Sequence, residues 1–148
     1  MTVVGVMACS KSKRGEDDPE ATFPARDLYD SWLFDGRVAA LEAHCDEWRI
    51  FSAKHGCVAP DDELSYYDVA LGQLASERRK ELAREVAAEL PAADAVMLLA
   101  GRTYARPLKE ALPNDVTVLD PLEGVQLFDQ REALQDLADG GFAEGEFR

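Results

Sequence analysis

The stretch that decides the fold is residues 48–56, which read WRIFSAKHG. It begins as an apolar run of the kind that forms a buried strand. It then changes abruptly to a hydroxyl group, a cation, an imidazole and a glycine, at Ser52, Lys54, His55 and Gly56. A strand that ends in polar groups and turns on glycine is typical of the ligand-binding edge of an open α/β sheet. The sequence therefore predicts a site at the end of this strand.

Strand-like runs alternate with helical patterns along the rest of the chain. Further strands are predicted over residues 2–8, 94–100 and 116–119, the first of them at the centre of the sheet. Helices are predicted over residues 24–34, 38–45, 76–90, 108–112 and 129–137, with Gly36 breaking or bending the first, Ser76 as an N-cap and a capping box at residues 129–132. This alternation indicates parallel strands joined by helical crossovers. We expect a three-layer α/β domain whose mainly parallel central sheet has about four or five strands.

Length and composition favour a single domain. With 148 residues, 47% of them hydrophobic, the chain can bury one core, which we place at residues 1–138, followed by an acidic tail at residues 139–148. The apolar run at residues 1–8 lacks a basic leader and is too short for a secretory signal, and no run reaches membrane-spanning length. Three cysteines at unrelated spacings argue against a disulfide framework. We therefore expect a cytoplasmic protein that does not bind membranes.

The net charge of -13, from 29 acidic and 16 basic residues, restricts the partners. Such a surface stays soluble at high salt and repels itself at low salt, so we expect a halophilic source. It disfavours nucleic acid as a partner, because duplex binding needs clustered Lys and Arg to neutralise phosphates. A small nucleotide or nucleobase bound in a local basic pocket is compatible with this net charge.

Four polar segments follow the predicted strands and are expected to gather along one edge of the sheet. They are residues 9–13, 52–56, 101–104 and 120–124. Within them, Cys9 is a candidate nucleophile, activated by neighbouring lysines, and His55 a candidate general base. Each has a structural alternative, since cysteine also packs as a small hydrophobe and histidine also braces turns. We expect no cofactor and no metal, because the cysteine and histidine spacing of zinc sites is missing.

Other side chains near these segments are predicted to bind the substrate. Lysine and arginine side chains would hold anionic groups, and tyrosine rings would stack a nucleobase or simply pack. The predicted substrate-binding residues are Ser10, Lys11, Lys13, Ser52, Lys54, Asp61, Tyr67, Arg102 and Tyr104. Trp32 and Trp48 are assigned to the core, and His44 is expected to be solvated.

Several motifs together resemble a small prokaryotic family of unknown function, whose members pair a CSKSK-type start with an SAKHG-type turn. They are CSKSK at residues 9–13, DLYDSWLF at 27–34, SAKHG at 52–56, PD at 60–61, YD at 67–68 and AGRTY at 100–104. Their order is more distantly similar to the YaaA peroxide-stress family, whose late LAS-x-EY element aligns with residues 99–104. That resemblance implies an α/β body associated with nucleic acid, with relatives linked to modified deazaguanine bases in DNA. This chain departs from YaaA proteins in its shorter length, its negative charge, its lack of a helix-hairpin-helix insertion, and its Cys9.

The sequence thus favours an α/β protein with a nucleotide or nucleobase pocket at the carboxyl ends of the strands. If the pocket is catalytic, Cys9 and His55 form the reactive pair, in chemistry of the thioimidate or glycosyl type. The alternatives are a non-catalytic nucleic-acid-binding module related to YaaA and a scaffold or interaction domain.

Overall fold

The computed structural model describes residues 1–140, without the side chains of residues 127 and 128. Its centre is a five-stranded sheet in the order β4-β3-β1-β6-β7. The strands are β1 (Val3–Ala8), β3 (Glu47–Ser52), β4 (Gly56–Val58), β6 (Ala95–Leu99) and β7 (Thr117–Leu119). The α/β class, the central position of β1 and the mainly parallel sheet are as the sequence predicts. Residues 141–148, most of the predicted acidic tail, lie outside the described residues.

The pairing of the strands brings the predicted polar segments to one edge. β1 runs parallel to β3 and to β6, and β6 runs parallel to β7. The carboxyl ends of these four strands therefore point the same way. β4 is the exception: it returns antiparallel to β3 through the turn at Lys54 and His55. Gly56 closes that turn with a φ of 75°, a conformation that residues with a Cβ atom rarely adopt.

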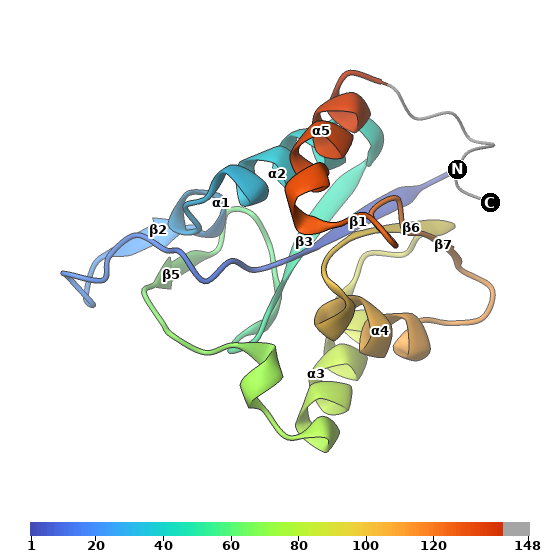
Figure 1. The fold of residues 1–148 in the computed structure, drawn as a ribbon. Coiled ribbons are helices and arrows are strands. Elements are labelled where there is room, and N and C mark those ends of the chain that lie inside the picture. Colours follow the sequence, from blue (N-terminus) through green and yellow to red (C-terminus); the bar gives the residue numbers. More distant parts are fainter. Residues whose placement is uncertain (141–148) are drawn as a thin grey trace.

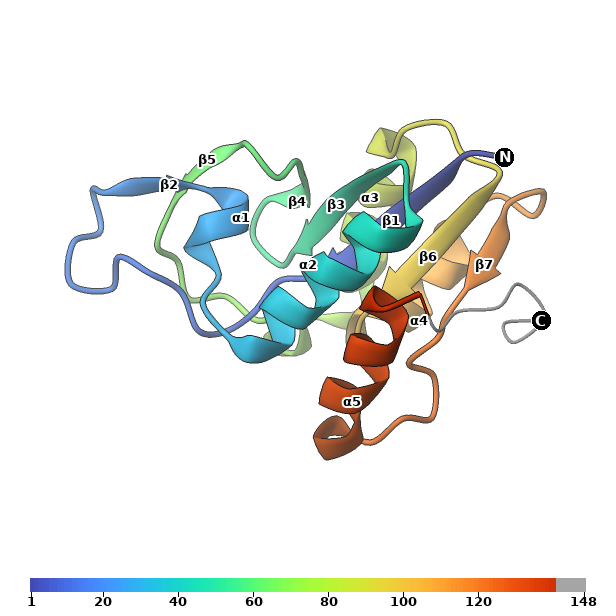
Figure 2. The same cartoon turned by 90° about the horizontal axis from the view of Figure 1, so that it is seen from above.

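Helices cover both faces of the sheet (Figures 1 and 2). One face carries α2 (Trp32–His44) and α5 (Leu127–Ala138), and the other carries α3 (Ser76–Glu89) and α4 (Arg102–Ala111). Successive residues of a strand point to opposite faces, so Met7 packs in the core under α2 and α5, and Val6 in the core under α3 and α4. β6 is buried along its whole length, as expected for a parallel strand covered on both sides. No helix within residues 1–140 has the length and apolar character needed to cross a bilayer.

A small second sheet lies to one side of the main one (Figure 1). Its strands β2 (Thr22–Pro24) and β5 (Glu63–Ser65) pair antiparallel, next to the one-turn helix α1 (Ala25–Leu28). The 3-10 turn η1 (Leu71–Gln73) then leads into α3. The sequence predicts neither strand and assigns Pro24 to a helix, because TFP and ELS contain no apolar run. Their position matters, because the residues that flank them reach the edge of the main sheet.

Five local predictions were wrong. The helix break comes at Tyr29–Ser31 and not at Gly36, because the Ser31 hydroxyl group accepts a hydrogen bond from the Phe34 amide and caps α2. Ser76 is the first residue of α3 and not its N-cap, and α5 begins at residue 127, before the predicted capping box. Trp32 is 48% exposed and lies against the guanidinium group of Arg131. His44 is not simply solvated, since its Nε2 lies 2.6 Å from the Leu137 carbonyl oxygen.

Gly5 makes the close packing of α2 on β1 testable. A Cβ atom at Gly5 would lie 2.5 Å from Leu41 Cδ2 and 3.0 Å from Cys45 Sγ, well inside van der Waals contact. We predict that Gly5→Ala lowers the free energy of unfolding by about 1–3 kcal/mol, the usual cost of overpacking a core. Urea denaturation followed by circular dichroism would measure it.

The matched control is Gly72→Ala, the same change where the nearest atom, Thr103 Cγ2, lies at an ordinary 4.0 Å. This variant should stay within about 0.5 kcal/mol of the parent protein. Equal effects of the two substitutions would show that α2 does not pack on β1 as described.

Candidate functional site

Cys9 directly follows β1 and lies at the carboxyl edge of the sheet. Its amide donates a hydrogen bond to the Phe51 carbonyl group at 3.1 Å, which extends the β1–β3 ladder by one residue. Its sulfur lies 3.3 Å from the hydroxyl oxygen of Tyr104, in the first turn of α4. That hydroxyl group also accepts a hydrogen bond from the Leu71 amide at 3.4 Å. Two of the predicted polar segments, residues 9–13 and 101–104, therefore meet at one half-buried thiol.

A chain of buried hydroxyl groups lies beside Cys9. The Tyr29 and Tyr67 hydroxyl groups share a hydrogen bond, and the Tyr67 hydroxyl group shares another, of 2.8 Å, with Ser52. Ser52 is fully buried, and its oxygen also accepts hydrogen bonds from the amides of Lys54 and His55, at 3.2 and 3.0 Å. The hydroxyl chain thus fixes the turn that the sequence predicted as a ligand rim. Ser52 acts here as the acceptor that holds this turn.

The buried tyrosines remain protonated in the neutral range. Burial, and secondarily the neighbouring sulfur of Cys9, raises the pKa of Tyr104 well above its usual value. The pKa of Tyr29 and that of Tyr67 are raised as well, in each case first by burial. Their hydroxyl groups are therefore available as hydrogen-bond donors at neutral pH.

Two lysines and a histidine surround the Tyr67 ring. Lys13 Nζ lies 4.4 Å from the ring centroid and Lys54 Nζ lies 5.9 Å from it, both within cation–π range. The His55 ring meets it edge to face at 5.1 Å. Burial lowers the pKa of Lys13, while Cys9 and then Asp68 act in the opposite direction. The pKa of His55 is lowered by burial and by Lys54, so its imidazole is mainly neutral at pH 7.

Arg37 is a buried cation in α2 that the sequence analysis missed. It is only 7% exposed, and its Nε atom has no hydrogen-bond partner within the part of the chain that the structure describes. Burial lowers its pKa to about 10, and the charge of Cys9 partly offsets that effect. It remains a cation at neutral pH and is within electrostatic range of the Cys9 sulfur. The signal was present in the sequence: Arg37 shares a helical stripe with the apolar residues Phe34 and Leu41.

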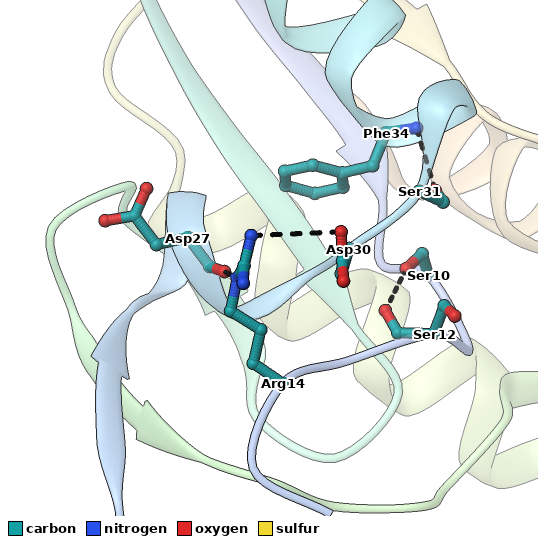
Figure 3. A network of polar contacts seen from close by, with 7 residues as sticks. All are labelled: Ser10, Ser12, Arg14, Asp27, Asp30, Ser31 and Phe34. Carbon is teal, nitrogen blue, oxygen red and sulfur yellow. Dashed lines mark hydrogen bonds and ion pairs between the residues drawn. The ribbon is translucent and has the colours of Figure 1, made fainter.

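The loop after Cys9 is fixed mainly by main-chain hydrogen bonds. The Arg14 amide donates to the Leu28 carbonyl group at 2.8 Å, and the Asp30 amide donates to the Ser12 carbonyl group at 2.9 Å. Figure 3 shows the side chains that add to them: Ser10 donates to the Ser12 carbonyl group at 2.7 Å, and Arg14 Nε to the Asp27 carbonyl group at 2.9 Å. The ion pair of Arg14 with Asp30 is 3.9 Å long and solvent-exposed, so it contributes little.

The structure gives the other predicted residues no contact with the thiol among the described side chains. Ser10 is used within its own loop, and Lys11 is exposed, with its carbonyl group accepting a hydrogen bond from Lys13 Nζ at 3.2 Å. Asp61 is exposed in the turn before β5. Arg102 starts α4 and lines two cavities beside that helix. Their contact with a substrate remains a prediction.

The proposed pairing of Cys9 with His55 has a different geometry from the one expected. No hydrogen bond joins these two side chains within residues 1–140, and the polar partner of the Cys9 sulfur is Tyr104. Both residues lie near Tyr67, His55 by ring contact and Cys9 through its effect on the Tyr67 pKa. Across the same described residues, no group of three or more His, Cys, Asp or Glu side chains is arranged to hold a metal ion.

Comparison with known proteins places this geometry in a family. A model for a family of unknown function, DUF6884, matches residues 4–136, which include all of these residues. The chain belongs to the DUF6884 family. It is also similar to the "Uncharacterized protein YfjM" of Bacillus subtilis (strain 168), with 28% identity over 125 residues that cover 79% of this chain and 81% of that protein. The DUF6884 site therefore has to be interpreted from its own chemistry.

The hydroxyl chain of this DUF6884 protein predicts a specific loss of stability. Tyr67→Phe removes the group that joins Tyr29 to Ser52 and leaves two buried hydroxyl groups short of a partner. We predict that it lowers the free energy of unfolding by about 1–3 kcal/mol, the cost of unsatisfied buried polar groups. Urea denaturation would measure the change.

The neighbouring Tyr66→Phe provides the control, because it removes the same hydroxyl group from a more exposed ring. Its unfolding midpoint should match that of the parent protein. A Tyr67→Phe protein as stable as the Tyr66→Phe protein would contradict the role given to the hydroxyl chain.

Proposed function

We propose that this protein binds a nucleotide or nucleobase at the carboxyl edge of the sheet and uses the Cys9 thiol as a nucleophile on it. The observation that carries the proposal is the contact of the Cys9 sulfur with the Tyr104 hydroxyl group at 3.3 Å. This contact places a half-buried thiol beside a proton donor at the end of the central strand. Ligands of open α/β sheets bind along this edge.

Two cations lie near the thiol. Lys13 and Arg37 are both within electrostatic range of Cys9, and the effect of Cys9 on each is to raise its pKa. Reactive cysteines are typically found beside cationic side chains of this kind. In an attack on an electrophilic carbon, the sulfur electron pair forms the new C–S bond, and the displaced electron pair moves to a neighbouring atom of the ligand, which takes a proton from solvent. The Tyr104 hydroxyl group, which burial keeps protonated at neutral pH, donates a hydrogen bond that stabilises the negative charge developing on that atom.

The remaining polar groups of the edge suit an anionic ligand. Lys54 and His55 are exposed at the rim, and the Ser52 oxygen holds their amides in place. A neutral imidazole there accepts or donates a hydrogen bond to a nucleobase, the role in which His55 best fits this geometry. The motif resemblance to the YaaA family also supports a nucleobase ligand. From this resemblance and the acidic composition, we propose that the protein is cytoplasmic and adapted to high salt.

Thiol reactivity tests the nucleophile directly. We predict that iodoacetamide near neutral pH alkylates Cys9 faster than Cys45 or Cys57. Burial raises the pKa of Cys45 to about 12 and that of Cys57 to about 11, which leaves these two thiols almost without thiolate. Peptide mapping by mass spectrometry at timed intervals would measure the three rates, in a high-salt buffer suited to the acidic surface.

Two further arms of the labelling experiment separate the claims. Lys13→Gln should slow the alkylation of Cys9 severalfold, whereas Arg84→Gln, which removes a charge from the exposed face of α3, should not change it. A nucleotide or nucleobase from a panel should protect Cys9 and raise the melting temperature. Labelling of Cys45 or Cys57 as fast as Cys9 would remove the nucleophile, and a panel without protection would remove the ligand class.

A second candidate function is a non-catalytic nucleic-acid-binding module related to YaaA. The observation that favours it is a group of four cations, Arg79, Lys80, Arg102 and Arg106, that line one cavity of 420 Å³ between α3 and α4. Binding of this kind would weaken steeply with salt and would survive the loss of Cys9. A filter-binding assay of the Cys9→Ala protein at several salt concentrations distinguishes it from the leading proposal.

A further inference from the structure

A cavity of 610 Å³ lies at the carboxyl ends of β6 and β7, on the side of α4 where the sheet ends. Its lining comes from the segment after β6, one face of α4, the segment after β7 and the early part of α5. Its volume is within the usual range of small-molecule sites, about 300–1,000 Å³. Cys9 and His55 are not among the residues that line it. The cavity is therefore separate from the thiol, although both lie at the same edge of the sheet.

Two side chains that line this cavity each have a buried acceptor atom without a hydrogen-bond partner among the described residues. The Asp120 side chain is only 9% exposed, and its Oδ2 pairs with Lys109 Nζ at 2.6 Å. Its other oxygen, Oδ1, is buried and accepts no hydrogen bond from any residue that the structure describes. Gln130 presents a second acceptor of this kind, because its Nε2 donates to the Val125 carbonyl group at 3.3 Å while its Oε1 has no donor in residues 1–140. Buried acceptors of this kind are costly unless a donor meets them.

The same cavity also presents unpaired cations. Arg102, Arg106 and Lys109 follow one face of α4 at helical spacing, and all three line the cavity. Lys109 is held by Asp120 and, more weakly, by Glu123 at 3.8 Å. Neither arginine has an ion pair with a described carboxylate, although the chain as a whole carries a net charge of -13. Two exposed guanidinium groups without an ion pair among the described residues are available to bind an anion in this otherwise acidic protein.

A neighbouring cavity extends this cationic surface. Arg102 and Arg106 also line the 420 Å³ cavity between α3 and α4, together with Arg79, Lys80 and the carboxylate of Glu110. Arg79 is half-buried, and its Nε atom has no hydrogen-bond partner among residues 1–140. Arg102 and Arg106 thus line both cavities. The cavity between α3 and α4 is rich in cations, and the cavity between α4 and β7 is lined by the two residues with unpaired acceptors.

We propose that the cavity between α4 and β7 binds a sugar phosphate, with adjacent sugar hydroxyl groups donating to Asp120 and Gln130 and the phosphate group on Arg102 and Arg106. A sugar phosphate is the simplest class of molecule that carries neighbouring donors and an anionic group at once. Hydroxyl donors satisfy the two open acceptors, and the guanidinium groups bind phosphate oxygens through paired hydrogen bonds. A nucleotide contains the same sugar phosphate and carries a base in addition, which would extend beyond the sugar.

The inference goes beyond the proposed function, because it needs no reaction at Cys9. It rests on that function only where the sugar phosphate is taken to be part of a nucleotide. A binding measurement that responds to cavity variants and not to Cys9→Ala establishes the cavity site by itself. The alkylation of Cys9, in turn, tests the thiol without reference to the cavity.

Isothermal titration calorimetry on the full chain, at constant high salt, tests the inference. The probes are ribose 5-phosphate, adenosine 5′-monophosphate, ribose alone and inorganic phosphate. Ribose 5-phosphate is expected to bind at least about tenfold more tightly than ribose or phosphate, because only it supplies both donors and anion. Tighter binding of the monophosphate than of ribose 5-phosphate identifies a nucleotide as the occupant, and equal binding identifies the sugar phosphate itself.

Two variants locate the site. Arg106→Gln, an exposed change, should weaken ribose 5-phosphate binding about tenfold and leave the melting temperature unchanged. Asp120→Asn should abolish the preference for ribose 5-phosphate over inorganic phosphate, because it replaces the charged acceptor. The matched control is Arg84→Gln, which removes an exposed charge from α3 and should bind as the parent protein does.

Three outcomes would overturn the proposal, the last of them in a further titration with a single-stranded oligonucleotide. Ribose 5-phosphate that binds no better than inorganic phosphate would show that Asp120 and Gln130 do not bind a sugar. An equal loss in the Arg106→Gln and Arg84→Gln proteins would show that the ligand responds to overall charge and not to this cavity. Binding of a single-stranded oligonucleotide that exceeds that of every small probe would also contradict it, in favour of a polymer on the cationic surface.

Discussion

The constraint on which the site depends is the hydrogen-bond chain from Ser52 through Tyr67 to Tyr29. It joins the end of β3, the segment after β5 and the break between α1 and α2, which are far apart in the sequence. Each hydroxyl group is buried, so it costs about 1–3 kcal/mol if it is left without a partner. These hydrogen bonds fix the small second sheet against the main sheet. They also hold the turn that carries Lys54 and His55 in place at the carboxyl edge of the main sheet.

The sequence predicted the features that follow from periodicity. The apolar runs that became β1, β3 and β6 were recognisable because these strands are buried on both faces, and the shorter run of β7 was recognisable from its β-branched residues. The order of the four runs implied a shared carboxyl edge. It did not predict features that depend on single contacts. A hydroxyl cap at Ser31 decided the helix break, and an aromatic contact with Arg131 keeps Trp32 at the surface. The strands β2 (TFP) and β5 (ELS) were not predicted, because neither contains an apolar run like that of β7.

The site shows the same division. The convergence of the segments after β1 and β6 followed from parallel strands, and Cys9 does meet Tyr104 there. The polar partner of the Cys9 thiol could not be predicted from the sequence. The orientation of His55 beyond the turn depends on the hydrogen bonds that Ser52 accepts. Arg37 shares a helical stripe with Phe34 and Leu41, so its burial follows from the sequence pattern, whereas its position near Cys9 depends on the packing of α2. The open acceptors of Asp120 and Gln130 depend on packing and are visible only in three dimensions.

The measurement that tests this account most directly is the ultraviolet titration of tyrosine ionisation in the folded protein. Of the four tyrosines, Tyr29, Tyr67 and Tyr104 have a pKa raised strongly by burial, and Tyr66 is the more exposed one. Because the folded chain keeps protons that the unfolded chain releases above pH ~10, stability should fall as the pH rises past that value. We predict that no more than one tyrosine ionises before the protein unfolds. Simultaneous ionisation of all four near pH ~10 in a folded protein would contradict it.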